Sequence, residues 1–353
     1  MNLLKKFERD TSQQYLPEID VLRFIAIITV MILHFNTAFF RENALFIQFP
    51  YEYKSYFHFL NIGGGVWLFF GISGFILALP FLKAGKISNL KRYFRRRIVR
   101  IEPPYLIALT FFFIVHIVMG TKGLSELTNH YLASLAYAHN YIYKDWSLIL
   151  PVAWSLEIEA QFYILMPALL FVILRLKSIY LRVVFYIFFA TLSLTFDFFE
   201  YKDLNDYMAF FICGIMTADF FVNIRFRQHW LWSALFSVSL VIFYWTEFPV
   251  IRVISLFLLL LSSLNSQELS FFLKNRVLAN IGAMCYSLYL LHYPFYYLAM
   301  KIFTNYLTVG DNMKLNFLVQ AIIFIPLSIF LISFFYLWIE KPFMKARFSK
   351  KIS

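Results

Sequence analysis

The chain has 353 residues, of which 61% are hydrophobic, 21% are aromatic and only 15% are charged. Soluble domains are about one quarter charged and about half apolar, so a soluble globular class is excluded. The low counts of Gly, Pro and Cys (11, 11 and 2) exclude collagenous, disordered and disulfide-stapled classes. The composition therefore predicts an integral membrane protein.

Ten apolar segments approach the ~20 residues that a helix needs to cross a bilayer. We predict an all-α membrane protein of about ten transmembrane helices, at 20–40, 63–82, 103–120, 151–174, 179–198, 205–222, 230–246, 249–265, 277–304 and 314–338. Two longer connections, 41–62 and 121–150, are rich in aromatic residues and are expected to pack over the outer mouth of the bundle. We expect one domain over 1–353, with a cytoplasmic leader at 1–19 and a basic cytoplasmic tail at 339–353.

The net charge of +12 follows the predicted topology. With the N-terminus in the cytoplasm, 23 of the 32 Lys and Arg residues lie on the inner side and 8 on the outer side. The positive-inside rule then places both termini in the cytoplasm. Topology and contact with the lipid bilayer account for the charge, so nucleic acid is not an expected partner. The leader has no cleavage pattern, so the first span is expected to stay as an anchor, and Cys213 and Cys285 lie within spans, where no disulfide is expected.

Arg23 and His34 are ionisable residues inside the first predicted span, where such groups are rare. Their spacing lies within about 20° of three whole helical turns, so both side chains leave the same helix face, ~16 Å apart along the axis. One interpretation is structural, with Arg23 snorkelling to the inner interface and His34 packing as a hydrogen-bonded residue. The other is a polar channel that this face lines from the cytoplasmic side inward.

The basic segment KRYFRRRIVRIEPPY, residues 91–105, lies at the inner end of the third predicted span. The positive-inside rule accounts for most of its charge. Arg97 and Arg100 nevertheless stand at i and i+3 on one helix face, and Pro103 and Pro104 are expected to mark where the span begins. Two aligned guanidinium groups at the membrane surface are suited to binding a polyphosphate.

The fourth predicted span opens with the polar segment WSLEIEAQFY. Ser155, Glu159 and Tyr163 follow one another at i,i+4 spacing, which predicts a polar stripe on one helix face. Glu157 lies on another face and is expected in the membrane interface. A buried Glu159 needs a partner or stays protonated, so we expect an Arg or His from another helix beside it. Structural stapling and catalysis both remain open for Glu159.

His292 lies in the ninth predicted span, within the segment SLYLLHYP. The structural interpretation is a histidine that the hydroxyls of Tyr289 and Tyr296 satisfy beside a kink at Pro294. The alternative is a position that faces a pore. Both interpretations remain open on the sequence alone.

Glu340, beside Lys341 near the end of the last span, is expected to form an interfacial ion pair, with a position facing the pore as the alternative. His116, Asp197 and Asp219 lie in or at the ends of spans without companions. We interpret these three residues as structural.

Three of these motifs occur in order along the chain, and the set resembles the acyltransferase-3 family of multipass bacterial membrane proteins. The family pattern of Arg, ten residues and His is met by Arg23 and His34. The R-x-x-R-I-x-P-x-Y and W-S-L-x-x-E-x-x-F-Y patterns are met by Arg97, Arg100, Ile101, Pro103 and Tyr105, and by Trp154, Ser155, Leu156, Glu159, Phe162 and Tyr163. The segments GGGVWLFFGISGFIL, SLYLLHYP and IEKPF also resemble family features, so the resemblance covers about 16–344.

The resemblance implies an O-acyltransferase of the bacterial inner membrane. The enzyme would move an acyl group, commonly acetyl, from cytoplasmic acyl-CoA to a hydroxyl of a cell-surface or lipid-linked glycan. His34 would act as general base, with a covalent acyl-histidine as the variant. Catalytic candidates are His34, Arg23 and Glu159, candidates for binding acyl-CoA are Arg97, Arg100 and Tyr105, and further pore candidates are Trp154, Ser155, Tyr163, His292 and Glu340.

The chain ends fifteen residues after the last predicted span, which predicts the stand-alone type of this family, without a periplasmic hydrolase-like domain. Acyl delivery would then be direct or would use a separate periplasmic partner. No tightly bound cofactor and no metal is expected. Two other classes compete with the enzyme: a transporter or flippase, for which repeat symmetry and interrupted helices are expected, and a non-catalytic scaffold for glycan export.

Overall fold

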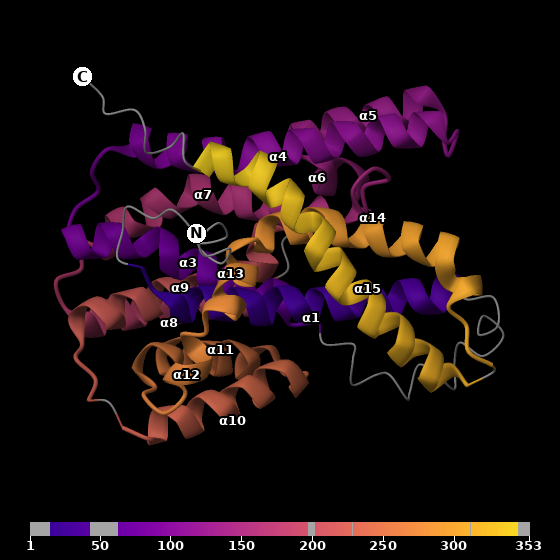
Figure 1. The fold of residues 1–353 in the computed structure, drawn as a ribbon. Helices are drawn as coiled ribbons and strands as arrows, with labels where there is room; N and C mark the ends of the chain where they lie inside the picture. Colours follow the sequence, from indigo (N-terminus) through magenta and orange to yellow (C-terminus); the bar gives the residue numbers. More distant parts are fainter. Residues whose placement is uncertain (1–14, 43–62, 197–201, 228, 311, 345–353) are drawn as a thin grey trace.

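The computed structural model of the protein describes residues 15–42, 63–196, 202–227, 229–310 and 312–344, and every regular element in these residues is a helix (Figure 1). The longer helices are α1 (Pro17–Glu42), α3 (Gly65–Ala84), α4 (Leu90–Val118), α5 (Leu124–Leu135), α7 (Trp154–Ile173), α8 (Ile179–Thr195), α9 (Leu204–Asn223), α10 (Leu231–Trp245), α11 (Pro249–Asn265), α13 (Arg276–Ala283), α14 (Cys285–Phe303) and α15 (Met313–Phe335). Shorter elements are α6 (His139–Tyr143), α12 (Ser270–Leu273), the 3-10 turns Pro151–Ala153 and Thr304–Tyr306, and a π-helix, Tyr336–Glu340. The all-α prediction is confirmed.

Five helical segments of the described residues are long and apolar enough to cross a membrane: Pro17–Arg41, Gly65–Ala84, Leu90–Val118, Pro151–Ile173 and Met313–Met344. Three shorter apolar helices, α8, α10 and α11, have between 15 and 17 residues. The predicted ninth span is divided at Met284 into α13 and α14. A multipass helical membrane protein is therefore supported, while the count of ten spans and the cytoplasmic termini remain predictions.

Helix α4 begins earlier than the sequence predicted. Asn89 caps it by accepting a hydrogen bond from the backbone N–H of Arg92 at 3.0 Å. From there the helix continues without interruption through Pro103 and Pro104. Arg97 and Arg100 therefore lie on a regular helix, as their i,i+3 assignment to one helix face requires, and the two prolines do not interrupt it.

The segment 121–150 folds back along the molecule instead of forming a simple outer loop. Helix α5 runs beside α4 (Figure 1), where the hydroxyl of Tyr105 donates to the carbonyl of Ser134 at 3.0 Å. Helix α6 then covers the first turn of α7, because the side chain of Asn140 donates to the carbonyl of Trp154 at 2.9 Å. The other long connection, 41–62, lies almost entirely outside the described residues.

Two glycines allow the backbones of neighbouring helices to approach closely. A Cβ at Gly214 of α9 would overlap the carbonyl oxygen of Gly71 in α3, and α3 and α9 form the most extensive helix pair. A Cβ at Gly282 of α13 would overlap the carbonyl oxygen of Asp20 in α1. Small residues at such crossings let helices pack at short distance in a membrane, so Gly214 sets the spacing of α9 from α3 and Gly282 sets the spacing of α13 from α1.

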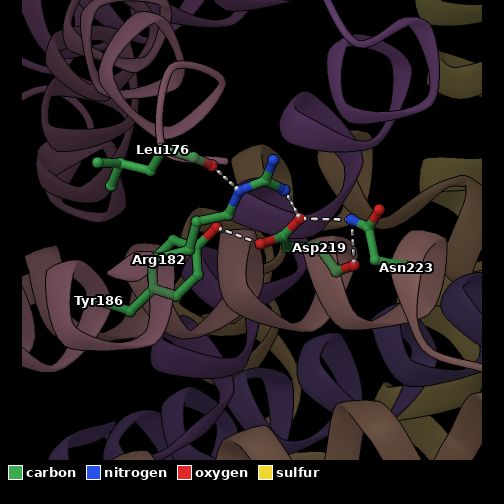
Figure 2. A network of polar contacts seen from close by, with 5 residues as sticks. All are labelled: Leu176, Arg182, Tyr186, Asp219 and Asn223. Carbon is green, nitrogen blue, oxygen red and sulfur yellow. Dashed lines mark hydrogen bonds and ion pairs between the residues drawn. The ribbon is translucent and has the colours of Figure 1, made fainter. Parts of the chain in front are cut away.

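Asp219 joins α8 to α9 through a buried polar network, which Figure 2 shows. The carboxylate is fully buried and accepts hydrogen bonds from Arg182 Nη1 at 2.8 Å, Tyr186 Oη at 2.9 Å and Asn223 Nδ2 at 2.7 Å. Arg182 Nε also donates to the carbonyl of Leu176 at 2.7 Å. The expectation that Asp219 has no companions was wrong, because a carboxylate buried among helices needs partners for its charge; the structural interpretation agrees with the network.

Of the other two residues interpreted as structural, the structure describes His116 but not Asp197. His116 shares a hydrogen bond with the hydroxyl of Thr121 at 2.8 Å, so it too has a companion. Asp197 lies outside the described residues. Cys213 and Cys285 are both buried and are not joined by a disulfide.

Replacing Asp219 with Ala is expected to destabilise the protein strongly. The change leaves Arg182, whose side chain is 16% exposed, without its counter-ion, and breaking a buried pair in this way costs about 3–5 kcal/mol. Thermal unfolding of the detergent-solubilised protein measures the loss. Glu126→Ala is the matched control: it removes an exposed pair with Lys122 at 3.4 Å, which is worth about 0–1 kcal/mol. Equal Tm values for the two variants would contradict the stapling role.

The predicted orientation is tested by single introduced cysteines on exposed positions of α4 and α5. Glu126→Cys is expected to react with a membrane-impermeant maleimide in intact cells, and Leu90→Cys only after the cells are opened. Leu90 and Glu126 are both exposed, and the native Cys213 and Cys285 are buried, so background labelling is low. The reverse labelling pattern would show that the N-terminal end of α4 faces outward.

Candidate active site

A partly open cavity lies between α1, α3, α4, α7 and α14. Six of the residues singled out by sequence line it: Arg23, Arg97, Arg100, Ser155, Glu159 and Tyr163. Polar residues that the sequence analysis did not propose for the site also line it, namely Ser73, Cys285, Tyr286 and Tyr289, and the remaining walls are apolar. The structure thus brings polar groups from five helices to one hollow in an apolar bundle.

Arg23 is held inside the molecule, not at the membrane surface. The side chain is 6% exposed, and its Nη1 donates to Oδ1 of Asp20 at 2.7 Å, one turn earlier on α1. Gly282 lets α13 press against the backbone of Asp20. The snorkelling interpretation is therefore wrong: Arg23 is fixed by an ion pair within α1 and presents its side chain to the cavity.

Arg97 and Arg100 enter the cavity from the same face of α4, as their i,i+3 spacing predicts. The guanidinium carbon of Arg97 lies 5.7 Å from the ring centroid of Tyr93 and 6.0 Å from that of Tyr163. Its Nε is buried and makes no hydrogen bond within the described part of the chain. A buried donor without a partner is costly, so Arg97 has hydrogen-bonding capacity left for a ligand in the cavity.

Glu159 is held by hydroxyl groups. Its Oε1 accepts hydrogen bonds from Ser73 Oγ at 2.7 Å and from Tyr163 Oη at 2.5 Å. We expected an Arg or His side chain directly beside Glu159. Within the described residues, the side chains that hydrogen-bond to it are those of Ser73 and Tyr163. Arg97 and Arg100 still interact electrostatically with Glu159 across the cavity, so one carboxylate faces the arginines without a direct ion pair.

The first turn of α7 is bonded to α14 and to α6. Ser155 Oγ and Tyr289 Oη lie 2.7 Å apart, and Tyr289 Oη also donates to the carbonyl of Val152 at 2.9 Å. Glu157 is 1% exposed and its Oε2 accepts from the backbone N–H of Asn140 at 2.8 Å. Glu157 is buried because α6 folds over this turn and covers it; its position in the membrane interface stays a prediction.

His34 and His292 form a direct pair beyond the cavity. His34 Nδ1 lies 2.6 Å from His292 Nε2, and His292 Nδ1 lies 2.7 Å from the carbonyl oxygen of Leu288. His292 is fully buried. The hydroxyls of Tyr289 and Tyr296 bond elsewhere, so the expectation that they satisfy His292 was wrong; spacing on one helix identified its neighbours but not its partner on α1.

The continuous polar channel predicted along α1 is not seen in the described residues. The cavity contains Arg23 but not His34. On α1, between Arg23 and His34, Ile27, Val30 and Met31 are buried in an apolar cluster. Tyr289 lies between the cavity and the histidine pair: it lines the cavity, and its ring centroid lies 5.9 Å from that of His292.

Two other candidates lie outside the cavity. Tyr105 is fully buried, its ring packs at a tilt against that of Tyr137 with centroids 5.2 Å apart, and its hydroxyl donates to the carbonyl of Ser134 in α5. Trp154 packs instead against Trp146 and Tyr207, with the Lys202 ammonium 4.3 Å from its ring centroid. Both belong to the motifs, but the structure gives them packing contacts rather than a place on the cavity wall.

Glu340 is fully buried and the neighbouring Lys341 is also buried, so neither side chain lies on an exposed surface; their interfacial ion pair stays a prediction. The π-helix after α15 ends at Glu340, whose Oε2 accepts hydrogen bonds from the backbone N–H and the hydroxyl of Ser287, at 3.1 and 2.5 Å. Glu340 also interacts electrostatically with Arg100. π-Helical turns redirect side chains and are frequent at functional sites, and here the turn supplies negative charge behind Arg100.

The polar residues at the cavity that the sequence analysis did not single out have only a weak signature in the sequence. Ser73 stands alone between the glycines of GISGF in an apolar helix, and a lone hydroxyl there is common. Asp20 precedes Arg23 by one helical turn, which is the spacing of a helical ion pair. No group of three or more metal-binding side chains occurs among the described residues.

The chain was compared with known families, curated proteins and solved structures. Residues 16–337 match the family described as the acyltransferase domain, acyltransferase-3. A Staphylococcus aureus (strain COL) protein named "Putative O-acetyltransferase SACOL0978" is 24% identical over 98% of this chain and 60% of its own length. The chain thus spans 60% of the length of the relatives that it matches from end to end. No solved structure matches the chain.

Two further relatives match about half of the chain. The peptidoglycan O-acetyltransferase OatA of Listeria monocytogenes is 28% identical over 46% of this chain and 25% of its own length. The O-acetyltransferase OatA of Staphylococcus aureus (strain NCTC 8325) is 27% identical over 49% of this chain and 28% of its own length. Since the family match extends over most of the chain, the protein belongs to the acyltransferase-3 family.

Proposed function

We propose that the protein is a membrane O-acyltransferase that moves an acetyl group from cytoplasmic acetyl-CoA to a hydroxyl of a cell-surface or lipid-linked glycan. The observation that carries the proposal is the cavity, which Arg23, Arg97 and Arg100 line together with Glu159. Concentrated guanidinium groups in an apolar bundle are expensive unless an anion joins them. A CoA polyphosphate supplies that anion.

Arg97 and Arg100 bind the phosphates in this proposal. Arg23 already has a partner in Asp20, and Arg100 faces Glu340, but the Nε of Arg97 has no partner within the described residues. Guanidinium groups bind phosphate oxygens through paired, charge-assisted hydrogen bonds. Tyr163 and Ser73 hold Glu159, so that its carboxylate balances the arginines without closing the cavity.

His34 acts as the general base. Its imidazole takes the proton of the acceptor hydroxyl while the hydroxyl oxygen bonds to the thioester carbon. The carbon–sulfur bond then breaks, and the imidazolium returns the proton to the CoA thiolate, which leaves as the thiol. His34 lies ~16 Å along α1 from Arg23 by the helical rise, so the extended arm of CoA would pass the Tyr289 ring to reach it.

The choice of donor, acceptor and location rests on the relatives. The names of the three relatives describe O-acetylation, and the Listeria protein acts by its name on peptidoglycan. These names support acetyl as the acyl group, and the name of the Listeria protein supports a cell-envelope glycan as the acceptor. The inner-membrane location is what membership of the acyltransferase-3 family implies. Delivery to the glycan is direct or uses a separate periplasmic partner.

The proposal is tested by adding acetyl-CoA, labelled in the acetyl group, to membranes that contain the protein. We expect release of CoA thiol and a labelled glycan, with the modified hydroxyl identified by mass spectrometry. Membranes without the protein are the background, and Glu126→Ala is a matched variant expected to keep full activity. A transporter or flippase would release no CoA, and that result would refute the enzyme.

A further inference from the structure

Both ring nitrogens of His292 are engaged, and each has a different kind of partner. Nδ1 lies 2.7 Å from the carbonyl oxygen of Leu288, one turn earlier on α14. Nε2 lies 2.6 Å from Nδ1 of His34. The two rings are inclined by only 22°, with centroids 4.9 Å apart, so they lie nearly edge to edge and the ring nitrogens face each other.

The carbonyl of Leu288 determines where the protons lie. A carbonyl oxygen only accepts hydrogen bonds, so Nδ1 of His292 carries a proton. A neutral His292 then has its lone pair on Nε2, which accepts a hydrogen bond from the Nδ1–H of His34. The remaining nitrogen of His34, Nε2, consequently carries a lone pair and is the basic atom of the pair.

The surroundings of His292 keep it neutral. The side chain is fully buried, and the groups that pack on it are His34 and the rings of Tyr289 and Tyr296. The Tyr289 hydroxyl donates to Val152, and the Tyr296 hydroxyl shares a hydrogen bond with Ser328. No carboxylate is among these contacts, and a buried imidazolium without one is strongly disfavoured.

We propose that His292 is a positioning residue, which fixes His34 in the tautomer protonated on Nδ1 and directs the lone pair of Nε2 to the acceptor hydroxyl. This inference rests on the proposed function of His34. Catalytic bases are commonly oriented by a third group that bonds their second nitrogen, and a carboxylate usually fills that role. Here a neutral imidazole fills it, because its own second nitrogen is tied to the backbone of α14. Tyr293 packs edge-on against His34 with centroids 5.2 Å apart and limits rotation of the ring.

Nitrogen NMR tests the tautomer on the wild-type protein, independently of activity. The full chain is labelled with ¹⁵N-histidine and placed in lipid nanodiscs, and the His34 signals are assigned as those missing from His34→Gln. We expect Nδ1 of His34 to carry the proton and its Nε2 to be unprotonated. A proton on Nε2 of neutral His34 would overturn the proposal. Since this measurement needs no turnover, it stays decisive even if acetyl transfer is absent and the proposed function fails.

Kinetics of acetyl transfer to the membrane glycan test the positioning role. His292→Leu is expected to lower kcat about 10²-fold or more, with the KM for acetyl-CoA unchanged, because the arginine cavity does not contain His292. His292→Gln places an amide oxygen where the Nε2 atom of His292 was, and this oxygen can accept a hydrogen bond from Nδ1 of His34. The variant is expected to recover most of the lost kcat. His116→Leu is the matched control and is expected to leave kcat unchanged. In the described residues, the His116 side chain forms its hydrogen bond with Thr121. A His292→Leu protein with wild-type kcat, or a His292→Gln protein as slow as His292→Leu, would overturn the role.

Discussion

His34→Gln is expected to lower acetyl transfer by about 10²–10⁴-fold, the typical contribution of a general base. The amide nitrogen still donates to Nε2 of His292, so the buried hydrogen bond survives while basicity is lost. Acetyl-CoA binding is expected to remain near normal, because the cavity that contains Arg97 and Arg100 does not contain His34. Surface-glycan acetylation, acetyl-CoA affinity and the quantity of detergent-extracted protein are measured together on this variant.

His34→Ala is the companion variant and is expected to be equally inactive. It leaves Nε2 of the fully buried His292 without a partner, so a loss of about 1–3 kcal/mol in stability accompanies the loss of activity. Comparing the two variants separates chemistry from packing. If His34 were only a packing residue, His34→Gln would stay active and only His34→Ala would lose expression or Tm; an active His34→Gln protein removes His34 from the mechanism.

Arg97→Ala is expected to raise the KM for acetyl-CoA by about 10- to 150-fold, with a smaller effect on kcat. The phosphates are remote from the reacting carbonyl, and losing a charged hydrogen-bonding partner costs about 1.5–3 kcal/mol. Arg100→Ala is expected to act in the same direction, with a loss of stability as well because Glu340 then loses a nearby cation. Replacement by Lys is expected to rescue poorly, since an ammonium cannot form the paired hydrogen bonds of a guanidinium.

Arg95→Ala is the matched control for the arginine variants. Arg95 lies on the same helix and in the same basic segment, but its side chain is exposed and does not line the cavity. Its KM is expected to be that of the wild type. Wild-type KM values for both Arg97→Ala and Arg100→Ala would show that the basic segment serves topology alone.

Helical periodicity was sufficient to place several residues on the correct faces. Arg97 and Arg100 share a face of α4, and Ser155, Glu159 and Tyr163 share a face of α7, and all five line one cavity. The all-α membrane class followed from composition, because no other class accommodates so many apolar side chains. These predictions needed only spacing within one helix.

Predictions about partners failed where the partner comes from a helix distant in the sequence. One interpretation of His292 used the tyrosines of its own helix, but it bonds His34, which is 258 residues away. Glu157 and Glu340 were expected in the membrane interface from their positions near helix ends. Both are buried inside the protein, because α6 covers Glu157 and the π-helix that ends at Glu340 brings this residue against Ser287 of α14. The direction in which a helix face points depends on packing between helices, which spacing along one helix does not contain.

In the proposed reaction acetyl-CoA enters from the cytoplasmic side, its phosphates bind in the cavity at Arg97, and its thioester reaches His34 beyond the cavity. Sealed inside-out vesicles that contain the protein, given labelled acetyl-CoA, test it most directly through the release of CoA thiol and the labelling of membrane glycan. We predict both products from inside-out vesicles, neither from right-side-out vesicles, and neither from inside-out vesicles with His34→Gln. Thiol release that is no greater than in vesicles without the protein, or that is undiminished in His34→Gln, would contradict the account.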